Sequence, residues 1–276
     1  MIQDIQPHVF HNEFNPRPVT PDSFICVYKN DSVLLNLKDG EMELPRLKDL
    51  RGSGLEDACR FLFAIDEEAF FLLFDLEVPE NGDWSYVSMM EVRNLNPVWK
   101  VFACALGDQL KRWFERNRFC GCCGGKTTLH TTERAFVCEN CGHTIYPDLP
   151  PSVIVGVTDG DRILLTKYAG RAFKRYALVA GYTEFGETLE ETVSREVQEE
   201  VGLKVKNIRY YKSQPWPFSG ALLVGYFAEL DGSDQITLQE SELAEGTWFK
   251  REDIPIMDSR LSLTNEMIEV FRLQKD

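Results

Sequence analysis

Apolar and polar residues in the second half of the chain alternate at two spacings, one typical of strands and one typical of helices. The stretch PSVIVGVTDGDRILLTKY (151–168) has two apolar runs around an Asp-Gly-Asp turn, which predicts a β-hairpin. Shorter apolar runs predict further strands, and apolar residues three and four positions apart predict helices. The predicted strands are 176–182, 207–212, 221–230 and 246–250, and the predicted helices are 97–119, 189–201 and 263–273.

The first hundred residues contain short apolar runs that are separated by polar turns. These runs are FICVY (24–28), SVLLNL (32–37), CRFLFAI (59–65) and AFFLLFDL (69–76). Their length and their β-branched and aromatic content predict a small, strand-rich α+β domain. None of these runs carries residues with recognisable chemistry.

The composition narrows the class of protein. With 276 residues, 43% hydrophobic and 12% aromatic, the chain can build about two compact domains. No run of about 18 uncharged apolar residues occurs, and the first residues, MIQDIQPHVFHNEF, lack the basic end and apolar run of a secretory signal. We therefore expect a cytoplasmic protein that does not span a membrane.

The charge of the chain argues against broad affinity for polyanions. Its 44 acidic and 30 basic residues give a net charge of −14, which repels nucleic acid and anionic membranes. A polyanionic substrate would have to be met by metal ions or by local basic patches. Two patches are present, Lys111, Arg112, Arg116 and Arg118, and Lys167, Arg171, Lys174 and Arg175. Each patch is either a binding surface or ordinary solvated charge.

Five of the eight cysteines lie between Cys120 and Cys141. Four of them form two pairs with two residues inside each pair and fourteen residues between the pairs, which is the spacing of a structural zinc ribbon. The four expected ligands are Cys120, Cys123, Cys138 and Cys141. Reduced or disulfide-linked cysteines are the alternative, and Cys122 is a spare thiol. Four thiolates close the coordination sphere, so this zinc would hold structure rather than do chemistry, and nucleic-acid binding by the ribbon stays open.

A run of glutamates follows the strand that ends near Gly181. On a helix, Glu196, Glu199 and Glu200 fall within an arc of about 100°, so three carboxylates crowd one face. Like charges at this spacing repel, and a hard divalent cation such as Mg²⁺ or Mn²⁺ would offset them. Arg195 can hold one of the carboxylates by a bidentate hydrogen bond. A solvated acidic helix is the alternative interpretation.

The residues around these acids resemble the signature of the Nudix hydrolases, G-x5-E-x7-R-E-U-x-E-E-x-G-U, in which U is apolar. The matching residues are Gly181, Glu187, Arg195, Glu196, Val197, Glu199, Glu200, Gly202 and Leu203. The resemblance implies an α/β/α sandwich that hydrolyses a nucleoside diphosphate linked to another group, with Mg²⁺ or Mn²⁺ bound by the acids. It implies that Glu196 and Glu200 are metal ligands, that Glu199 is a ligand or a base, and that the carbonyl of Ala180 is a further ligand. Which glutamate acts as the base is left open.

The stretch SQPWPF (213–218), expected to be a loop, resembles the substrate-specifying loop of NADH pyrophosphatases. Members of that group carry a zinc ribbon between an N-terminal domain and the Nudix domain, so we expect an N-terminal α+β domain at 1–115, a zinc ribbon at 116–148 and a Nudix domain at 149–276. The resemblance also implies a homodimer, and it implies that Glu242, or its neighbour Glu245, is a fourth acidic metal ligand. The implied substrate contacts are Glu133, Tyr146, Tyr182, Gln214, Trp216, Ala221 and Thr264.

The resulting hypothesis is a metal-dependent enzyme that splits NAD(H) into nicotinamide mononucleotide and AMP, and that also removes NAD caps from RNA. The chain departs from the group after Phe218, where Ser219, Gly220 and Ala221 replace a proline, a polar residue and a serine. Two alternatives follow: hydrolysis of another nucleoside diphosphate derivative, such as ADP-ribose or a dinucleoside polyphosphate, and a non-catalytic Nudix module that senses a nucleotide.

Overall fold

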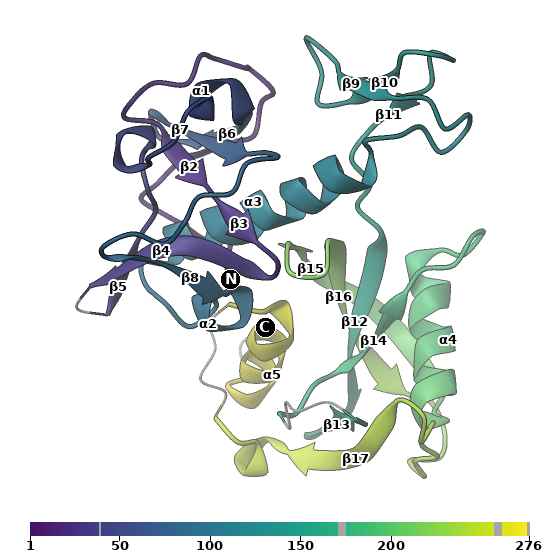
Figure 1. Ribbon diagram of the computed structural model, residues 1–276. Helices are drawn as coiled ribbons and strands as arrows, with labels where there is room; N and C mark the ends of the chain where they lie inside the picture. Colours follow the sequence, from purple (N-terminus) through teal and green to yellow (C-terminus); the bar gives the residue numbers. More distant parts are fainter. Residues whose placement is uncertain (39, 171–174, 257–260, 275–276) are drawn as a thin grey trace. The chain divides into compact units, whose positions relative to one another are not determined.

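The computed structural model of the chain describes residues 1–38, 40–170, 175–256 and 261–274 (Figure 1). The chain separates into two compact units. The C-terminal unit contains Leu149–Trp216 and Gly220–Asp276 with Met1, and the N-terminal unit contains Ile2–Asp148 with Pro217–Ser219. The three-domain division at 1–115, 116–148 and 149–276 stays a prediction.

The C-terminal unit is built on a six-stranded mixed sheet. Its strands are β12 (Pro151–Asp159), β13 (Arg162–Tyr168), β14 (Val179–Tyr182), β15 (Val205–Trp216), β16 (Ala221–Leu230) and β17 (Leu243–Lys250). The strand order is β15-β16-β12-β13-β17, and β14 pairs with β12. The predicted hairpin is confirmed as β12 and β13, and β12 runs parallel to β16.

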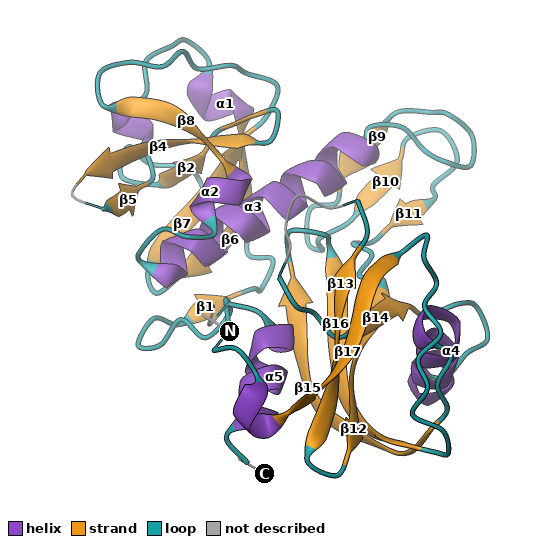
Figure 2. Ribbon diagram, turned by 90° about the horizontal axis from the view of Figure 1, so that it is seen from below, coloured by secondary structure: helices purple, strands orange, loops and turns teal. Residues whose placement is uncertain are grey.

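Two helices cover opposite faces of this sheet, as Figure 2 shows. They are α4 (Leu189–Val201) and α5 (Leu263–Arg272), and a short 3-10 helix, η2 (Arg251–Asp253), follows β17. Val193, Val197 and Val201 of α4 pack in one apolar cluster with the odd-numbered valines of β12, whereas Met267 and Ile268 of α5 pack in another cluster with Ile154. Because side chains alternate between the faces of a strand, the two clusters lie on either side of the sheet. The expected α/β/α sandwich is therefore confirmed.

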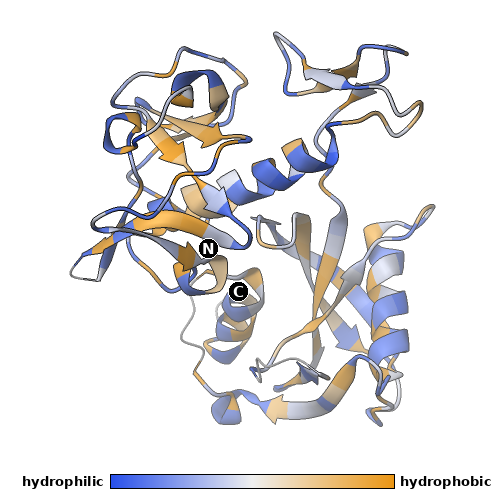
Figure 3. Ribbon diagram, viewed as in Figure 1, coloured by the Kyte–Doolittle hydropathy of each residue, from blue (hydrophilic) through white to orange (hydrophobic). Residues whose placement is uncertain are grey.

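Local signals in the sequence explain both ends of α4. Thr188 and Glu191 form a capping box, in which the Thr188 hydroxyl accepts from the Glu191 N–H and the Glu191 carboxylate accepts from the Thr188 N–H. Gly202 ends the helix in the left-handed conformation, with φ at 70°. Figure 3 shows α4 as a mostly hydrophilic ribbon interrupted by hydrophobic positions, as expected for a helix that buries one stripe.

The N-terminal unit contains two four-stranded sheets and a long helix. The strand order is β1-β6-β7-β2 in one sheet and β3-β4-β5 in the other, where β8 also pairs with β4. The strands are β1 (Phe10–His11), β2 (Phe24–Cys26), β3 (Tyr28–Lys29), β4 (Ser32–Lys38), β5 (Glu41–Glu43), β6 (Cys59–Ile65), β7 (Glu68–Leu73) and β8 (Trp84–Ser88). The helices are η1 (Leu47–Asp49), α1 (Leu55–Ala58), α2 (Met89–Val92) and α3 (Val98–Arg116). The four apolar runs thus form β2, β4, β6 and β7, and the expectation of a strand-rich α+β region is confirmed.

The cysteine-rich segment of this unit forms a small antiparallel sheet. Its strands are β9 (Thr127–Leu129), β10 (Phe136–Cys138) and β11 (Thr144–Ile145), in the order β11-β10-β9. In the described part of the chain, no helix is long and apolar enough to cross a membrane.

The expectation that SQPWPF is a loop is wrong for its first four residues. Residues 213–216 are the end of β15 and pair with β16, so that Trp216 lies opposite Ala221. Only 217–220 form the turn, which is closed by a hydrogen bond from the Gly220 N–H to the Trp216 carbonyl (2.9 Å). Because β15 is an edge strand, Pro215 is tolerated there despite its missing N–H. The cross-strand pairing, which the two prolines conceal in the sequence, decides the local structure.

The end of α4 yields a test of how the helix is terminated. A Cβ at Gly202 would lie 2.9 Å from Thr237 Cβ, whereas a Cβ at Gly160, which also has a positive φ (60°), would meet no atom within 4 Å. We expect Gly160→Ala to cost about 1 kcal/mol from backbone strain alone, and Gly202→Ala to cost more, about 2–3 kcal/mol. Thermal unfolding followed by circular dichroism measures both. Equal shifts of the two midpoints would contradict the role given to the Thr237 contact.

Candidate active site

Most of the predicted catalytic residues line one hollow of the C-terminal unit. The hollow has a volume of about 580 Å³ and is bordered by β14, α4 and the loop that precedes β17. Its lining residues are Ala180, Gly181, Tyr182, Glu196, Glu199, Gln239 and Glu242. Three carboxylates and the backbone of β14 therefore converge from segments that are up to about sixty positions apart in the sequence.

Strand β14 holds its backbone close to the acids of α4. Ala180 lies opposite Ile154 of β12, and this pairing fixes the position of the strand. A Cβ at Gly181 would overlap the carboxylate of Glu196, so only glycine lets the helix approach this closely. The glycine of the signature thus has a steric reason in this chain, namely the space that it leaves for Glu196.

Arg195 connects the acids of the signature to one another. Its guanidinium donates to both carboxylate oxygens of Glu187, with Nε–Oε1 at 2.6 Å and Nη2–Oε2 at 2.9 Å. Its Nη1 also donates to Glu196 (2.7 Å) and to Glu199 (3.0 Å), and its Nη2 donates to the Tyr182 carbonyl (2.9 Å). The predicted bidentate hydrogen bond is present, and its acceptor is Glu187 rather than a residue of the hollow. One arginine therefore orients two lining carboxylates and ties α4 to β14.

The protonation of these carboxylates follows from their surroundings. The hydrogen bonds from Arg195 lower the pKa of Glu187 to about 2, helped by the Glu184 N–H. Burial raises the pKa of Glu196, although the hydrogen bond from Arg195 opposes this shift. A carboxylate in a desolvated position is more stable as the anion when a cation lies beside it. Glu196 is thus electrostatically suited to a second cation in addition to Arg195.

Glu200 lies on the same helix but is more deeply buried. Its residue is 2% exposed, compared with 9% for Glu196, and it does not border the hollow. Buried carboxylates are stabilised by pairing or by metal coordination. The donor set here consists of oxygen atoms only, from glutamates and from the backbone of β14, which suits Mg²⁺ or Mn²⁺ rather than a soft metal. The residues therefore fit a hard divalent cation.

The structure separates the two candidates for a fourth acid. Glu242 lines the hollow, and its Oε1 accepts from Gln239 Nε2 (3.2 Å). Glu245 does not line it, and instead accepts from Lys167 Nζ (2.7 Å) and from the Tyr176 hydroxyl (2.9 Å). Lys167 and Tyr176 also lower the pKa of Glu245. Gln239 was missed by the sequence analysis, and its only signal was its place three residues before Glu242.

The four predicted zinc ligands come together in the cysteine-rich segment. Their sulfur atoms all lie within 4.8 Å of one another, with Cys120 Sγ–Cys141 Sγ at 3.8 Å and Cys123 Sγ–Cys138 Sγ at 3.4 Å. A tetrahedral zinc ion with Zn–S bonds of about 2.3 Å requires sulfur separations of about 3.8 Å. The cluster therefore has the donors and the spacing for zinc, and Cys122 is exposed beside it.

The residues expected from the loop resemblance occupy different environments. Gln214 is fully buried, where its Nε2 donates to the Leu261 carbonyl (2.8 Å) and its Oε1 accepts from the Leu263 N–H (2.7 Å). Ala221 is 1% exposed, and Trp216 is half-buried at the end of β15. Thr264 is half-buried in the first turn of α5. Gln214 thus ties β15 to the start of α5, and the substrate contacts assigned to these four residues stay predictions.

Two further expected contacts lie in the N-terminal unit. The Tyr146 hydroxyl donates to Glu133 Oε2 (3.0 Å), and the Tyr146 ring is 57% exposed. The hydrogen bond places the two residues on one surface of the cysteine-rich segment. Their contact with a substrate stays a prediction.

Ion pairs neutralise three residues of the first basic patch and one of the second. In the first, Lys111 and Arg112 both pair with Asp108, and Arg118 pairs with Asp75. In the second, Lys167 pairs with Glu245, and Arg171 and Lys174 lie outside the described residues. Pairing lowers the positive charge that a patch offers to phosphates.

Comparison with known proteins agrees with this geometry. Residues 148–273 match the family model of the NUDIX domain. Two relatives named NAD-capped RNA hydrolase NudC, from Enterobacter sp. (strain 638) and Escherichia coli O9:H4 (strain HS), are 39% and 38% identical over 163 residues. The match covers 59% of this chain and 63% of each relative, so the chain spans less than two thirds of their length.

A crystal structure of a NUDIX hydrolase from Nitrosomonas europaea superimposes with a TM-score of 0.49 at 24% identity, over 57% of this chain and 92% of that one. The family match covers the sandwich, the capped helix with its acids and the hollow beside them. Residues 148–273 of the chain therefore resemble a NUDIX domain in sequence.

Proposed function

We propose that the chain is a metal-dependent hydrolase that splits the diphosphate bond of NAD(H) into nicotinamide mononucleotide and AMP. The observation that carries the proposal is the convergence of Glu196, Glu199 and Glu242 with the β14 backbone in one hollow. The names of the NudC relatives support a substrate that contains NAD. For the same reason we propose that NAD-capped RNA is a second substrate.

The residues of the chain have separable tasks in this reaction. Glu196, Glu199, Glu200, Glu242 and the Ala180 carbonyl would hold Mg²⁺ or Mn²⁺, which when bound offsets phosphate charge and lowers the pKa of a water molecule. Arg195 keeps Glu196 and Glu199 in place through Nη1. Glu199, which is more exposed than its two neighbours, has the freedom to accept the proton of the attacking water.

Tyr182 supports the recognition of a planar group next to this centre. It lines the hollow and is 50% exposed, so its ring can stack against a base or against nicotinamide without losing buried contacts. The rates with NADH and with NAD⁺ would measure which of the two is preferred. A homodimer and a cytoplasmic location stay predictions.

For the cysteine cluster we propose a structural zinc ion. The sulfur separations support four thiolate ligands, and four ligands leave no open position for a substrate. The short strands β9, β10 and β11 carry few buried apolar residues, so zinc binding would supply the free energy that holds them together.

The reaction can be tested with a panel of substrates and one substitution. The purified chain is incubated with NADH, NAD⁺, ADP-ribose, a diadenosine polyphosphate and NAD-capped RNA, each with Mg²⁺ or Mn²⁺, and the products are identified by mass. We expect nicotinamide mononucleotide and AMP from NADH, and a loss of at least about a hundredfold in kcat for Glu200→Gln. Cleavage of ADP-ribose or the polyphosphate alone would instead support a hydrolase of another nucleoside diphosphate derivative. If the wild-type chain cleaves none of these substrates, the proposal that it is a hydrolase of this class is refuted.

The choice between the two candidate acids gives a second prediction. Glu242→Gln removes a carboxylate from the hollow, so we expect a drop in kcat of about tenfold or more and a higher metal requirement for half-maximal activity. Glu245→Gln is the matched control, because Glu245 pairs with Lys167 and Tyr176 instead. Its activity should stay close to wild type. Equal losses in both variants would remove the distinction between the two glutamates.

The zinc ion gives a third prediction. We expect about one zinc per chain, measured by mass spectrometry of the metal content, and a clear loss of zinc in Cys138→Ser. The control is Cys122→Ser, because the exposed Cys122 is outside the four-sulfur cluster. Unchanged zinc content in Cys138→Ser, or equal loss in the control, would show that the cluster does not hold the ion.

A further inference from the structure

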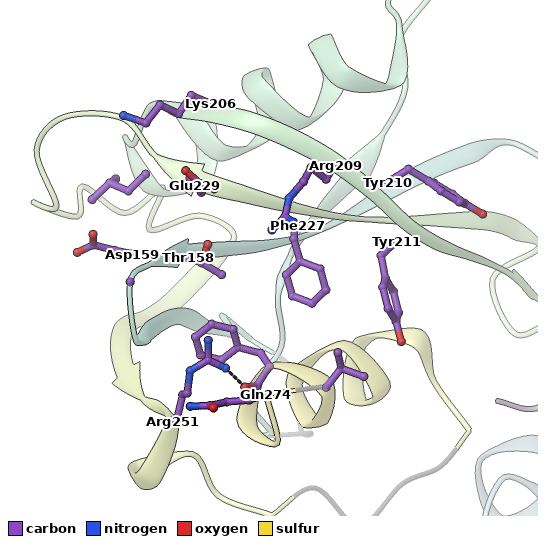
Figure 4. A pocket seen from close by; sticks show the side chains of 14 residues that line it. Thr158, Asp159, Lys206, Arg209, Tyr210, Tyr211, Phe227, Glu229, Arg251 and Gln274 are labelled. Carbon is purple, nitrogen blue, oxygen red and sulfur yellow. Dashed lines mark hydrogen bonds between the residues drawn. The ribbon is translucent and has the colours of Figure 1, made fainter. Parts of the chain in front are cut away.

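A second hollow lies on the face of the sheet that α5 covers, and the proposed reaction does not use it. It has a volume of about 1050 Å³ and is lined by β15, β16, the end of β12, η2 and the C-terminal end of α5 (Figure 4). Sites for small organic ligands occupy roughly 300–1000 Å³. The hollow therefore has room for a molecule the size of a nucleotide.

Cationic and aromatic side chains meet in this hollow. Arg209 lies directly opposite Phe227 on the neighbouring strand, so both side chains are on the same face of the sheet. The rings of Tyr211 and Phe227 are in edge contact, with centroids 5.5 Å apart. In Figure 4, the Phe227 ring and the Tyr211 ring both extend from the sheet toward α5. They provide flat apolar surfaces next to a guanidinium.

The opposite wall adds a second guanidinium. Arg251 donates through Nη1 to the Phe271 carbonyl, and its guanidinium carbon lies 3.8 Å from the centre of the Phe271 ring. This contact offsets the negative end of α5, which would otherwise repel an anion. The remaining guanidinium N–H groups of Arg251 make no other hydrogen bond within the described residues.

The balance of charge in this hollow differs from that of the chain. Its described lining residues include three cations, Lys206, Arg209 and Arg251, and two carboxylates, Asp159 and Glu229. Lys206 pairs with Asp231 (3.1 Å), Asp159 pairs with Arg162, and Glu229 accepts from Asn207 Nδ2 (2.8 Å). Arg209 is exposed and forms no ion pair with any described residue. In a chain with a net charge of −14, an arginine that no carboxylate neutralises is available to an anion.

We propose that this hollow is a second binding site, for a phosphorylated nucleoside. Arg209, with Arg251, binds the phosphate through charge-assisted hydrogen bonds, and the ring of Phe227 or Tyr211 contacts the base. Arg209 and Tyr211 are two residues apart on β15, and the strand is irregular between Tyr210 and Lys212, so the phosphate and the base have contacts at neighbouring but separate points of the strand. The site does not depend on the proposed hydrolysis.

The test is a titration of the full chain with AMP by isothermal calorimetry in EDTA, where the acidic hollow has no divalent cation. We expect binding that Arg209→Ala weakens about tenfold or more, and that Arg209→Lys weakens less. The control is Lys204→Ala, because Lys204 is an exposed lysine of the same segment that does not line the hollow. Glu196→Gln is expected to bind AMP as the wild type does. Adenosine and ribose 5-phosphate, which each lack one half of the ligand, should bind more weakly than AMP.

A short oligoadenylate distinguishes the two sources of a phosphorylated nucleoside. Tighter binding than AMP, lost in Arg209→Ala, identifies a nucleotide within an RNA strand, whereas equal or weaker binding identifies a free nucleotide. Absence of binding by both ligands in EDTA would overturn the proposal. The proposal would also be overturned if Arg209→Ala and Lys204→Ala bound AMP with equal affinity. It would be overturned as well if Glu196→Gln lost as much affinity for AMP as Arg209→Ala.

Discussion

The repulsion between carboxylates on α4 is the constraint around which the C-terminal unit is arranged. Glu196, Glu199 and Glu200 share one side of a helix, which disfavours both the helix and its burial. Arg195 offsets part of this repulsion, because a single guanidinium contacts Glu187, Glu196 and Glu199. The same side chain donates to the Tyr182 carbonyl, so the charge compensation also joins the helix to β14. A lysine could neutralise one carboxylate but could not make these contacts together, since it lacks the planar fork.

The position of α4 follows from packing on its other side. Val193, Val197 and Val201 are fully buried against the sheet, so the hydrophobic stripe decides which way the acids point. Gly181 then allows β14 to approach the Glu196 carboxylate. The capping box at Thr188 and the left-handed Gly202 set the two ends of the helix, and therefore its register. Charge, packing and caps thus act on the same thirteen-residue segment, and a shift of one residue would turn the acids away from the hollow.

Local signals made this part of the fold predictable from the sequence. The spacing of the apolar residues predicts the bounds of α4 at 189–201, and the observed bounds agree, with Thr188 and Gly202 capping the two ends. The strand at residues 213–216 was harder to predict from the sequence. The two prolines of SQPWPF favour a loop, and the strand that pairs with 213–216 follows only after the turn. The choice between Glu242 and Glu245 was likewise open, since only the register of β17 with β13 places Glu245 opposite Lys167. The hollow on the α5 face has no signature at all, because Arg209, Phe227 and Arg251 are brought together by strand pairing and helix packing.

The sheet separates two electrostatic environments within one domain. On the side of α4, the clustered carboxylates repel phosphate unless a cation is bound in the hollow. On the side of α5, Arg209 lies opposite Phe227, Arg251 lies over the Phe271 ring, and the nearby Asp159 is paired with Arg162. An anion can therefore approach the second face without a metal, whereas it needs one at the first. The strands between them are packed on both faces by separate apolar clusters, so each hollow has its own electrostatic environment although both belong to one sheet.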